Sequence, residues 1–274
     1  MSPVPLPKVT VAREAMATEF DITIAGKPGR AARQAAEAAL AELVALEQEL
    51  SRYVENSDIS RINRLPAGAS TVVTPETFEC LRIALEMQRR TGGAFDVAYA
   101  SRGDGAGKER FRLDPGRVAV EVLVEGARVD LGGIGKGFAL DHMAGILVEW
   151  GIESALVRAS HSTILATGAP PGEDGWPVGF GPAGHRVEFS LANRALGASG
   201  TGVKGEHIID PSTGKPASGR YRTWSLAPTG AEADALSTAF MVMTPPMIRE
   251  LLVRRPEYKA WIESGPDEPV QAIL

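Results

Sequence analysis

Apolar and polar side chains alternate along the first part of the chain, most clearly in the sequence FDITI at residues 20–24. A period of two residues is typical of a strand that buries one face. We therefore expect extended structure over residues 9–25, ending at the turn-forming sequence GKPG at 26–29. Directly after this break the spacing of the apolar residues changes to three and four, which predicts helix.

The first predicted helix covers residues 30–50, where Leu40, Leu43, Val44 and Leu50 fall on one side. A second is predicted to begin after Thr74, because a threonine followed by proline is a frequent start of a helix. Two glycines at 92–93 would end it near residue 90. Further helices are predicted over 135–150, over 231–242 and from 245 onward.

Short apolar runs predict strands at 118–129, 155–157, 164–166, 187–191 and 225–227. The charged, glycine-containing stretch 102–108 has loop composition. The sequence shows no internal repeat, low-complexity tract or linker, so we expect a single domain over residues 1–274, with an extended leader at 1–8. Long helices mixed with clustered strands favour the α+β class.

Composition narrows the possible partners and the compartment. The net charge of −5 over 274 residues gives no reason to expect a nucleic-acid partner. Local donors and a metal could still hold a phosphate in one pocket. One cysteine, Cys80, excludes an intrachain disulfide, and no run approaches the roughly 20 apolar residues of a membrane span. We expect a cytoplasmic protein, or a periplasmic one if a signal segment has been removed.

Three segments contain residues suited to chemistry, and the first is VDLGGIGKG at 129–137. A predicted strand leads Asp130 into a glycine-rich turn, and a helix follows at once. Glycines let backbone N–H groups approach a phosphate, and the start of a helix favours negative charge. Lys136 would lie at the same end and balance a phosphate. The alternative is an ordinary tight turn with a solvated lysine.

The second segment is EHIIDPSTGKP at 206–216. Its His207 could take a proton from an attacking hydroxyl near neutral pH. A structural histidine is the alternative for this position. We expect the Asp210 carboxylate to cap the turn that DPSTG forms.

The third segment is EADALSTA at 232–239, which is predicted to be helical. Asp234 and Thr238 are four residues apart and share one face, where they could form part of an oxygen shell for Mg²⁺. The alternative is an aspartate at the helix start and a threonine bonded back to a carbonyl. The opposite face would anchor the helix in the core through Leu236, Ala239, Phe240 and Met243.

These segments follow three others in one order along the chain: MAT at 16–18, SRY at 51–53 and TGGAFD at 91–96. Six motifs in this order resemble those of the ApbE family, the FAD:protein FMN transferases. The resemblance extends over most of the chain, from Met16 to Thr238. It implies an ApbE-like, T-fold-related α+β fold in which mixed or antiparallel sheets pack against helices.

The resemblance also implies an activity. A Mg²⁺-dependent transferase would move the FMN half of FAD to a Ser or Thr hydroxyl of an acceptor protein, and AMP would leave. His207 would be the base and Lys136 would stabilise charge. Metal ligands would be Gly133, through its carbonyl, together with Asp234 and Thr238. Flavin-dinucleotide contacts would come from Met16, Tyr53, Ala94, Phe95, Asp96, Asp130, Lys136 and Ile208. Capping of a turn is the alternative role for Asp96.

The chain departs from the family pattern at several places. Residues 158–163 read RASHST where the family has an Asn-x-Gly-Gly-Asp loop, so both glycines are replaced. The stretch between Asp96 and Asp130 is short, and Ala17 replaces a glycine. No lipoprotein cysteine lies near the start, so we expect no membrane anchor. Two other functions remain open, an FAD pyrophosphatase and a non-catalytic FAD-binding protein.

Overall fold

The computed structural model describes residues 8–101, 109–202, 205 and 207–274. Its centre is an eight-stranded sheet in the order β1-β2-β6-β7-β10-β13-β14-β15. Each neighbouring pair in it is antiparallel. The strands are β1 (Lys8–Ala15), β2 (Thr18–Ala25), β6 (Ala155–Ala159), β7 (Thr163–Thr167), β10 (Arg194–Gly200), β13 (Arg222–Ala227), β14 (Lys259–Glu263) and β15 (Gln271–Ile273).

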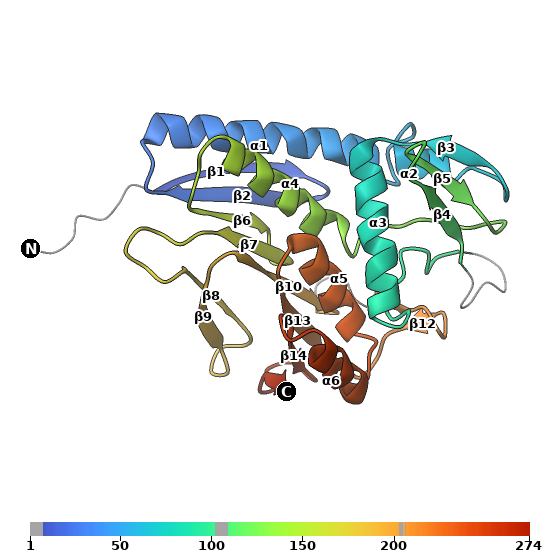
Figure 1. Cartoon of the computed structure of the whole chain (residues 1–274). Helices are drawn as coiled ribbons and strands as arrows, with labels where there is room; N and C mark the ends of the chain where they lie inside the picture. Colours follow the sequence, from blue (N-terminus) through green and yellow to red (C-terminus); the bar gives the residue numbers. More distant parts are fainter. Residues whose placement is uncertain (1–7, 102–108, 203–204, 206) are drawn as a thin grey trace, which may run out of the picture.

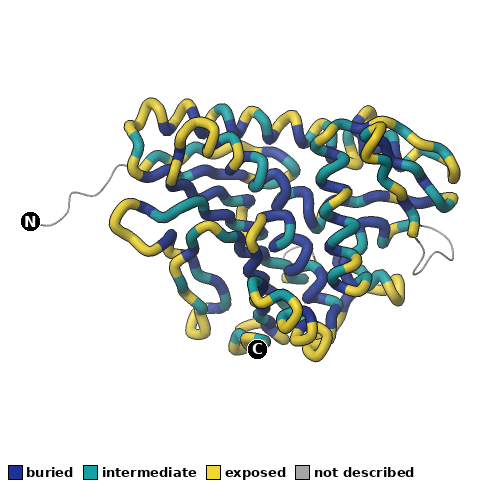
Figure 2. The backbone as a smooth tube through the Cα atoms, in the orientation of Figure 1, coloured by how far each residue is buried: buried dark blue, intermediate teal, exposed yellow. Residues whose placement is uncertain are grey.

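Three helices pack on one face of this sheet: α1 (Gly29–Leu50), α4 (Gly135–Glu149) and α5 (Gly230–Phe240). Figure 1 shows α1 running along the sheet, with α4 and α5 beneath it. Alternate sheet residues such as Phe20, Val157 and Ala195 point into this layer and are buried. Figure 2 shows the buried backbone concentrated where the sheet meets these helices. The helical layer is therefore the main core.

The other sheet face bears a second cluster, formed by the residues between those of the main core, such as Leu156, Leu196 and Trp224. A hairpin of β8 (Trp176–Phe180) and β9 (Val187–Leu191) covers it. Phe180 stacks on Trp224 with ring centroids 4.8 Å apart. Aromatic stacking thus holds the hairpin on the sheet.

Helix α3 (Pro75–Arg90) contacts both α1 and α5. A three-stranded sheet beside it has the order β3-β5-β4 and packs with α2 (Asp58–Ile62) (Figure 1). The other elements are β3 (Ser70–Val72), β4 (Phe111–Asp114), β5 (Ala119–Val122), β11 (Ile209–Asp210), β12 (Lys215–Pro216) and α6 (Pro245–Arg254). The predicted α+β class is confirmed, and no described helix is long and apolar enough to cross a membrane.

The extended structure predicted over 9–25 is confirmed, but it forms two strands, because the chain turns back between β1 and β2. Met16 and Ala17 form the turn with φ values of 49° and 57°. Non-glycine residues rarely adopt this conformation, and no glycine or asparagine marks the turn in the sequence. The carboxylate of Glu47 on α1 accepts a hydrogen bond from the Met16 N–H at 2.8 Å, so a tertiary contact stabilises the turn.

Other predicted elements differ from the observed ones in their length or in which residues they bury. Val44 is 40% exposed, because it lies one residue and about 100° around α1 from the buried Leu43. The strand predicted over 118–129 is confined to β5, and a turn with Gly126 at φ 73° follows it. The strand predicted over 187–191 is β9. Of the predicted leader, residues 1–7 lie outside the described part, as does the predicted loop 102–108.

Candidate active site

The junction of α4 and α5, defined by the first turns of the two helices, holds the predicted phosphate and metal residues. A Cβ atom on Gly137 would lie 2.0 Å from the carbonyl oxygen of Gly230, and one on Gly230 would lie 2.4 Å from that of Gly137. No side chain fits at either position, so the two backbones touch. This approach brings Asp234 to the start of α4, where its Oδ2 accepts a hydrogen bond from the Gly137 N–H at 3.1 Å.

Lys136 completes the charged part of this junction. Its Nζ lies 3.6 Å from Asp234 Oδ2 and donates to the carbonyl of Gly132 at 3.1 Å. The Asp234 side chain is only 3% exposed, so the ion pair is shielded from water on the carboxylate side. The backbone N–H of Lys136 makes no hydrogen bond to a described residue. Lys136 thus presents an ammonium group and an amide donor at one helix start, which suits a phosphate.

Thr238 lies one turn further along α5. A Cβ on Gly133 would be 3.1 Å from Thr238 Oγ1, so the turn at residues 132–134 before α4, the glycine turn, lies next to this hydroxyl. Thr238 Oγ1 lies 3.2 Å from the Asp234 carbonyl, the backward bond expected as its alternative role, and 3.2 Å from Ser199 Oγ. A hydroxyl that donates one hydrogen bond keeps lone pairs for a cation.

These oxygens fit Mg²⁺ better than a softer metal. Within the described residues, no three His, Cys, Asp or Glu side chains are grouped as a metal site. A cation at the junction would therefore have one carboxylate, a hydroxyl and backbone carbonyls as protein ligands. Mg²⁺ commonly binds through one or two carboxylates and completes its shell with water and phosphate oxygens. No hydrogen bond from a described residue reaches Asp234 Oδ1, which leaves that oxygen for a ligand.

Asp130 lies at the other side of the glycine turn. Its Oδ1 accepts from the Gly132 N–H at 2.9 Å, and its Oδ2 accepts from the Tyr99 hydroxyl at 2.7 Å. The Arg52 guanidinium is 3.0 Å from the same Oδ2 and lies over the Tyr53 ring, 4.8 Å from its centroid. Tyr53 itself is 83% exposed. The structure thus brings the predicted contacts Asp130 and Tyr53 together through Arg52.

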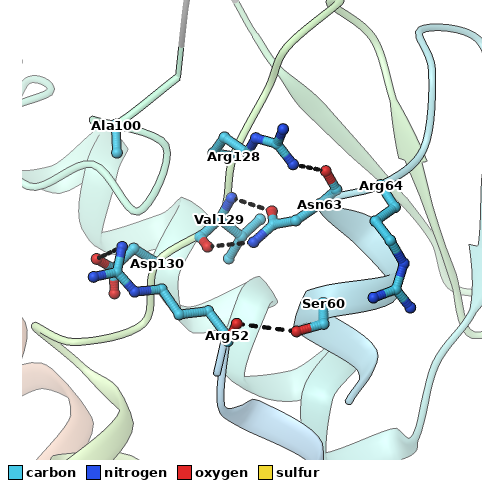
Figure 3. A pocket seen from close by; sticks show the side chains of 8 residues that line it. All are labelled: Arg52, Ser60, Asn63, Arg64, Ala100, Arg128, Val129 and Asp130. Carbon is cyan, nitrogen blue, oxygen red and sulfur yellow. Dashed lines mark hydrogen bonds and ion pairs between the residues drawn. The ribbon is translucent and has the colours of Figure 1, made fainter. Parts of the chain in front are cut away.

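A pocket of about 410 Å³ opens beside Asp130 (Figure 3). Arg52, Arg64 and Arg128 line the pocket. The Asn63 side chain, also in the lining, forms hydrogen bonds with both the N–H and the carbonyl of Val129. Three guanidinium groups against one carboxylate give this pocket a positive charge within an acidic chain.

The predicted contacts at 94–96 lie where α3 ends. Phe95 is buried and touches the glycine turn, since a Cβ on Gly133 would be 3.2 Å from its ring. Asp96 Oδ1 accepts from the Ala98 N–H at 2.7 Å, which is the turn-capping role expected as the alternative. Burial raises the pKa of the Asp96 carboxyl, although Arg110 lies 3.7 Å away. Ala94 is buried as well.

For three further predicted residues, Met16, Ile208 and His207, the described contacts are with other parts of the chain than the first turns of α4 and α5. Met16 occupies the β1–β2 turn and packs on the main core. Ile208 is buried against Met241, the C-cap residue that follows α5. His207 is exposed, and its Nδ1 lies 2.9 Å from the carbonyl oxygen of Gly205. The structure confirms that Asp210 caps its turn, because its Oδ1 accepts from the Ser212 N–H at 2.8 Å.

The altered segment 158–163 contains the end of β6, the turn at 160–162 and the first residue of β7. Ser160 stands at one of the replaced glycines and has a φ of 47°, the backbone conformation that glycine favours. Arg158 forms three hydrogen bonds to the Asp21 carboxylate at 2.7–3.0 Å. The turn has therefore kept a left-handed residue without the glycine, and an ion pair holds the strand that enters it.

Sequence reasoning missed four residues that touch the site: Arg52, Tyr99, Ser199 and Asp141. Arg52 and Tyr99 bond to Asp130, and Ser199 Oγ is 3.2 Å from Thr238 Oγ1. Asp141 accepts hydrogen bonds at the start of α5. The signal for Asp141 was present, since a carboxylate in the mostly apolar stretch 138–148 needs a partner.

A family model described as the ApbE family matches residues 16–262. This range contains the glycine turn, the junction and His207. The chain belongs to the ApbE family. The resemblance seen in the six motifs is thereby confirmed.

Named relatives agree with this assignment. The FAD:protein FMN transferase of Treponema pallidum is 29% identical over 266 residues, covering 77% of this chain and 73% of the relative. The FAD:protein FMN transferase of Escherichia coli K12 is 24% identical over 280 residues, covering 87% and 79%. The Vibrio cholerae flavin transferase ApbE superposes with a TM-score of 0.85 at 21% identity, over 98% and 97% of the chains. At that identity the superposition establishes the ApbE fold.

Proposed function

We propose that this ApbE-family chain is an FAD:protein FMN transferase that depends on Mg²⁺. It would transfer the FMN moiety of FAD to a Ser or Thr hydroxyl of an acceptor protein and release AMP. The observation that supports this most directly is the α4–α5 junction, where Lys136 lies 3.6 Å from Asp234 under the glycine turn. Phosphoryl transfer proceeds mainly through charge stabilisation, and at this junction a cation, the Lys136 ammonium and the Lys136 backbone N–H would supply the positive charge and the donors.

The residues divide the work as follows. Gly133, Asp234 and Thr238 would hold the cation, whose chemistry is to balance charge on the phosphate oxygens. Lys136 would donate hydrogen bonds to the pyrophosphate from its ammonium group and from its backbone N–H. Tyr53 would stack against a ring of FAD in place of Arg52. The new bond joins the acceptor oxygen to the phosphorus of FMN, and the bond that breaks joins that phosphorus to the oxygen bridging to AMP.

His207 is suited to remove the proton of the acceptor hydroxyl. A carbonyl oxygen only accepts, so the 2.9 Å contact with Gly205 requires the hydrogen to be on Nδ1. In the neutral ring Nε2 then has a free lone pair and serves as the base. The exposure of this side chain allows a hydroxyl on another protein to reach it.

The test uses purified protein, FAD, Mg²⁺ and an acceptor fragment with a Ser/Thr flavinylation motif. We expect the acceptor to gain the mass of FMN with one AMP released per modified chain. Two controls are the reaction without Mg²⁺ and an acceptor whose Ser or Thr is replaced by Ala. Release of AMP and FMN without modified acceptor would instead indicate an FAD pyrophosphatase. Bound flavin without any AMP would indicate a non-catalytic FAD-binding protein and refute the proposal.

A further inference from the structure

The two helices at the junction cap each other. The residue preceding α4, Ile134, provides no side-chain cap, and the carboxylate of Asp234 on α5 takes that role by accepting from the Gly137 N–H. In return, Asp141 on α4 accepts from the Gly230 N–H at 2.6 Å and from the Ala231 N–H at 2.9 Å. Each helix thus supplies a carboxylate to the first turn of the other.

With this exchange, the backbone N–H groups in the first turn of α5 all donate hydrogen bonds within the protein. Besides the two amides bonded to Asp141, the Glu232 N–H donates to the Thr229 hydroxyl at 3.2 Å, and the Ala233 N–H donates to the Thr229 carbonyl at 3.0 Å. The start of α5 therefore has no donor left for a phosphate. Asp141 fixes where α5 begins relative to α4, and Asp234 lies only three residues beyond Ala231.

We propose that Asp141 is a positioning residue for the cation site: by bonding the first two amides of α5, it holds Asp234 and Thr238 in register with Gly133 on the glycine turn. This inference rests on the proposed function. A helix held at one fixed offset presents its metal ligands at one fixed spacing. Without Asp141, the backbone contact of Gly137 and Gly230 remains, yet α5 is free to shift by the small distances that Mg²⁺ coordination does not tolerate.

The decisive variant is Asp141→Asn, which keeps the size of the side chain but places an NH₂ group against an amide N–H. Binding of Mn²⁺ alone is measured by electron paramagnetic resonance and calorimetry, at a temperature well below unfolding. We expect binding to weaken roughly ten- to hundredfold, as for other groups that orient metal ligands. We also expect FMN transfer by the variant to recover at raised Mg²⁺, since the defect lies in metal binding.

The matched control is Asp114→Asn. Asp114 also accepts from two backbone amides, Gly116 at 3.0 Å and Arg117 at 3.3 Å, but it lies in the three-stranded sheet. Its replacement should leave Mn²⁺ binding unchanged. If Asp141→Asn does not fold, Asp141→Ser retains one acceptor and should bind Mn²⁺ more weakly than wild type.

The outcomes separate the two proposals. Equal Mn²⁺ affinity in wild type and a folded Asp141 variant, even with lowered stability, would overturn the positioning role and leave the proposed function untouched. Absence of Mn²⁺ and Mg²⁺ binding by wild type would overturn the metal-dependent function together with this inference.

Discussion

The α4–α5 junction and the segment that carries His207 are held in opposite ways. At the junction, helices distant in sequence touch backbone to backbone, and Ala231, Ala233 and Asp234 are at most 2% exposed. The His207 segment, residues 207–216, contains only the two-residue strands β11 and β12, and local bonds such as those of Asp210 shape it. Tertiary packing thus preorganises the residues that we propose to bind phosphate and metal, whereas local turn chemistry holds the proposed base.

Asp234→Ala should have the largest effect and tests the junction side of this contrast. We expect transfer to fall at least about 10³-fold, because the cation loses its one carboxylate and Lys136 loses its partner. Stability should fall by about 1–2 kcal/mol through loss of the Gly137 cap. Initial rates and thermal unfolding measure the two effects. Mg²⁺-dependent activity retained in the variant would place the metal elsewhere.

His207→Ala should lower activity without lowering stability, unlike a substitution at the α4–α5 junction. We expect kcat to fall about 10²-fold, as for loss of a general base, while the free energy of unfolding stays within about 0.5 kcal/mol. The side chain is exposed and bonds only to Gly205 among described residues, so little packing is lost. His185, exposed in the β8–β9 turn, is the matched control, and His185→Ala should leave both quantities unchanged. An unchanged kcat in His207→Ala would remove His207 from the mechanism.

The same contrast explains what the sequence could predict. The glycine turn, the start of α4 and the Asp234–Thr238 face were predictable, because helix period and turn residues are local signals. The anchoring of α5 through Leu236 and Phe240 is confirmed, since both are fully buried. The close contact of Gly137 with Gly230 was not predictable, because local sequence patterns do not specify which residues distant in sequence come into contact.

Strand β10 shows why part of the fold was missed. Its sequence, RALGASG, has small residues with weak strand propensity and no alternation. It is nevertheless central in the sheet, and a Cβ on Gly197 would lie 2.2 Å from the carbonyl oxygen of Ala233. The small residues are there to let α5 approach the sheet, so tertiary packing decided the sequence of this strand rather than strand propensity.

Gly137→Ala measures the close packing of the junction directly. We expect the free energy of unfolding to fall by about 2–3 kcal/mol, because the new methyl group overlaps the Gly230 carbonyl. Gly214→Ala, in the His207 segment, is the matched comparison: it has a φ of 66° and nothing within 4 Å, so only backbone strain of about 1 kcal/mol applies. Chemical denaturation gives both values, and equal losses would contradict the contrast.

The pH dependence of stability tests whether the Asp141 carboxyl is desolvated at the junction. Desolvation raises the pKa of the Asp141 carboxyl to about 6, against the opposing effect of its two amide donors. The folded state therefore binds a proton near pH 6 that the unfolded chain binds only near its ordinary pKa of about 4. From pH 7.5 to 5, stability of wild type should rise by about 1 kcal/mol relative to Asp141→Asn. A relative fall would mean that the amide donors outweigh desolvation.

Arg52→Ala should have the smallest effect on stability and on FAD binding. It tests whether the preorganised site includes Arg52, which lies beside the glycine turn at Asp130. Arg52 is 40% exposed, and its ion pair with Asp130 should contribute less than about 1 kcal/mol to stability. The guanidinium covers Asp130 and the Tyr53 ring, two of the groups that we propose FAD contacts, so FAD would have to displace it. We therefore expect Arg52→Ala to bind FAD about two- to fivefold more tightly in a metal-free fluorescence titration. Arg82→Ala, which breaks a surface pair with Glu79, is the control and should not change the affinity. Weaker binding in Arg52→Ala would mean that Arg52 itself holds the nucleotide, and the ordered site would then reach into the arginine-lined pocket.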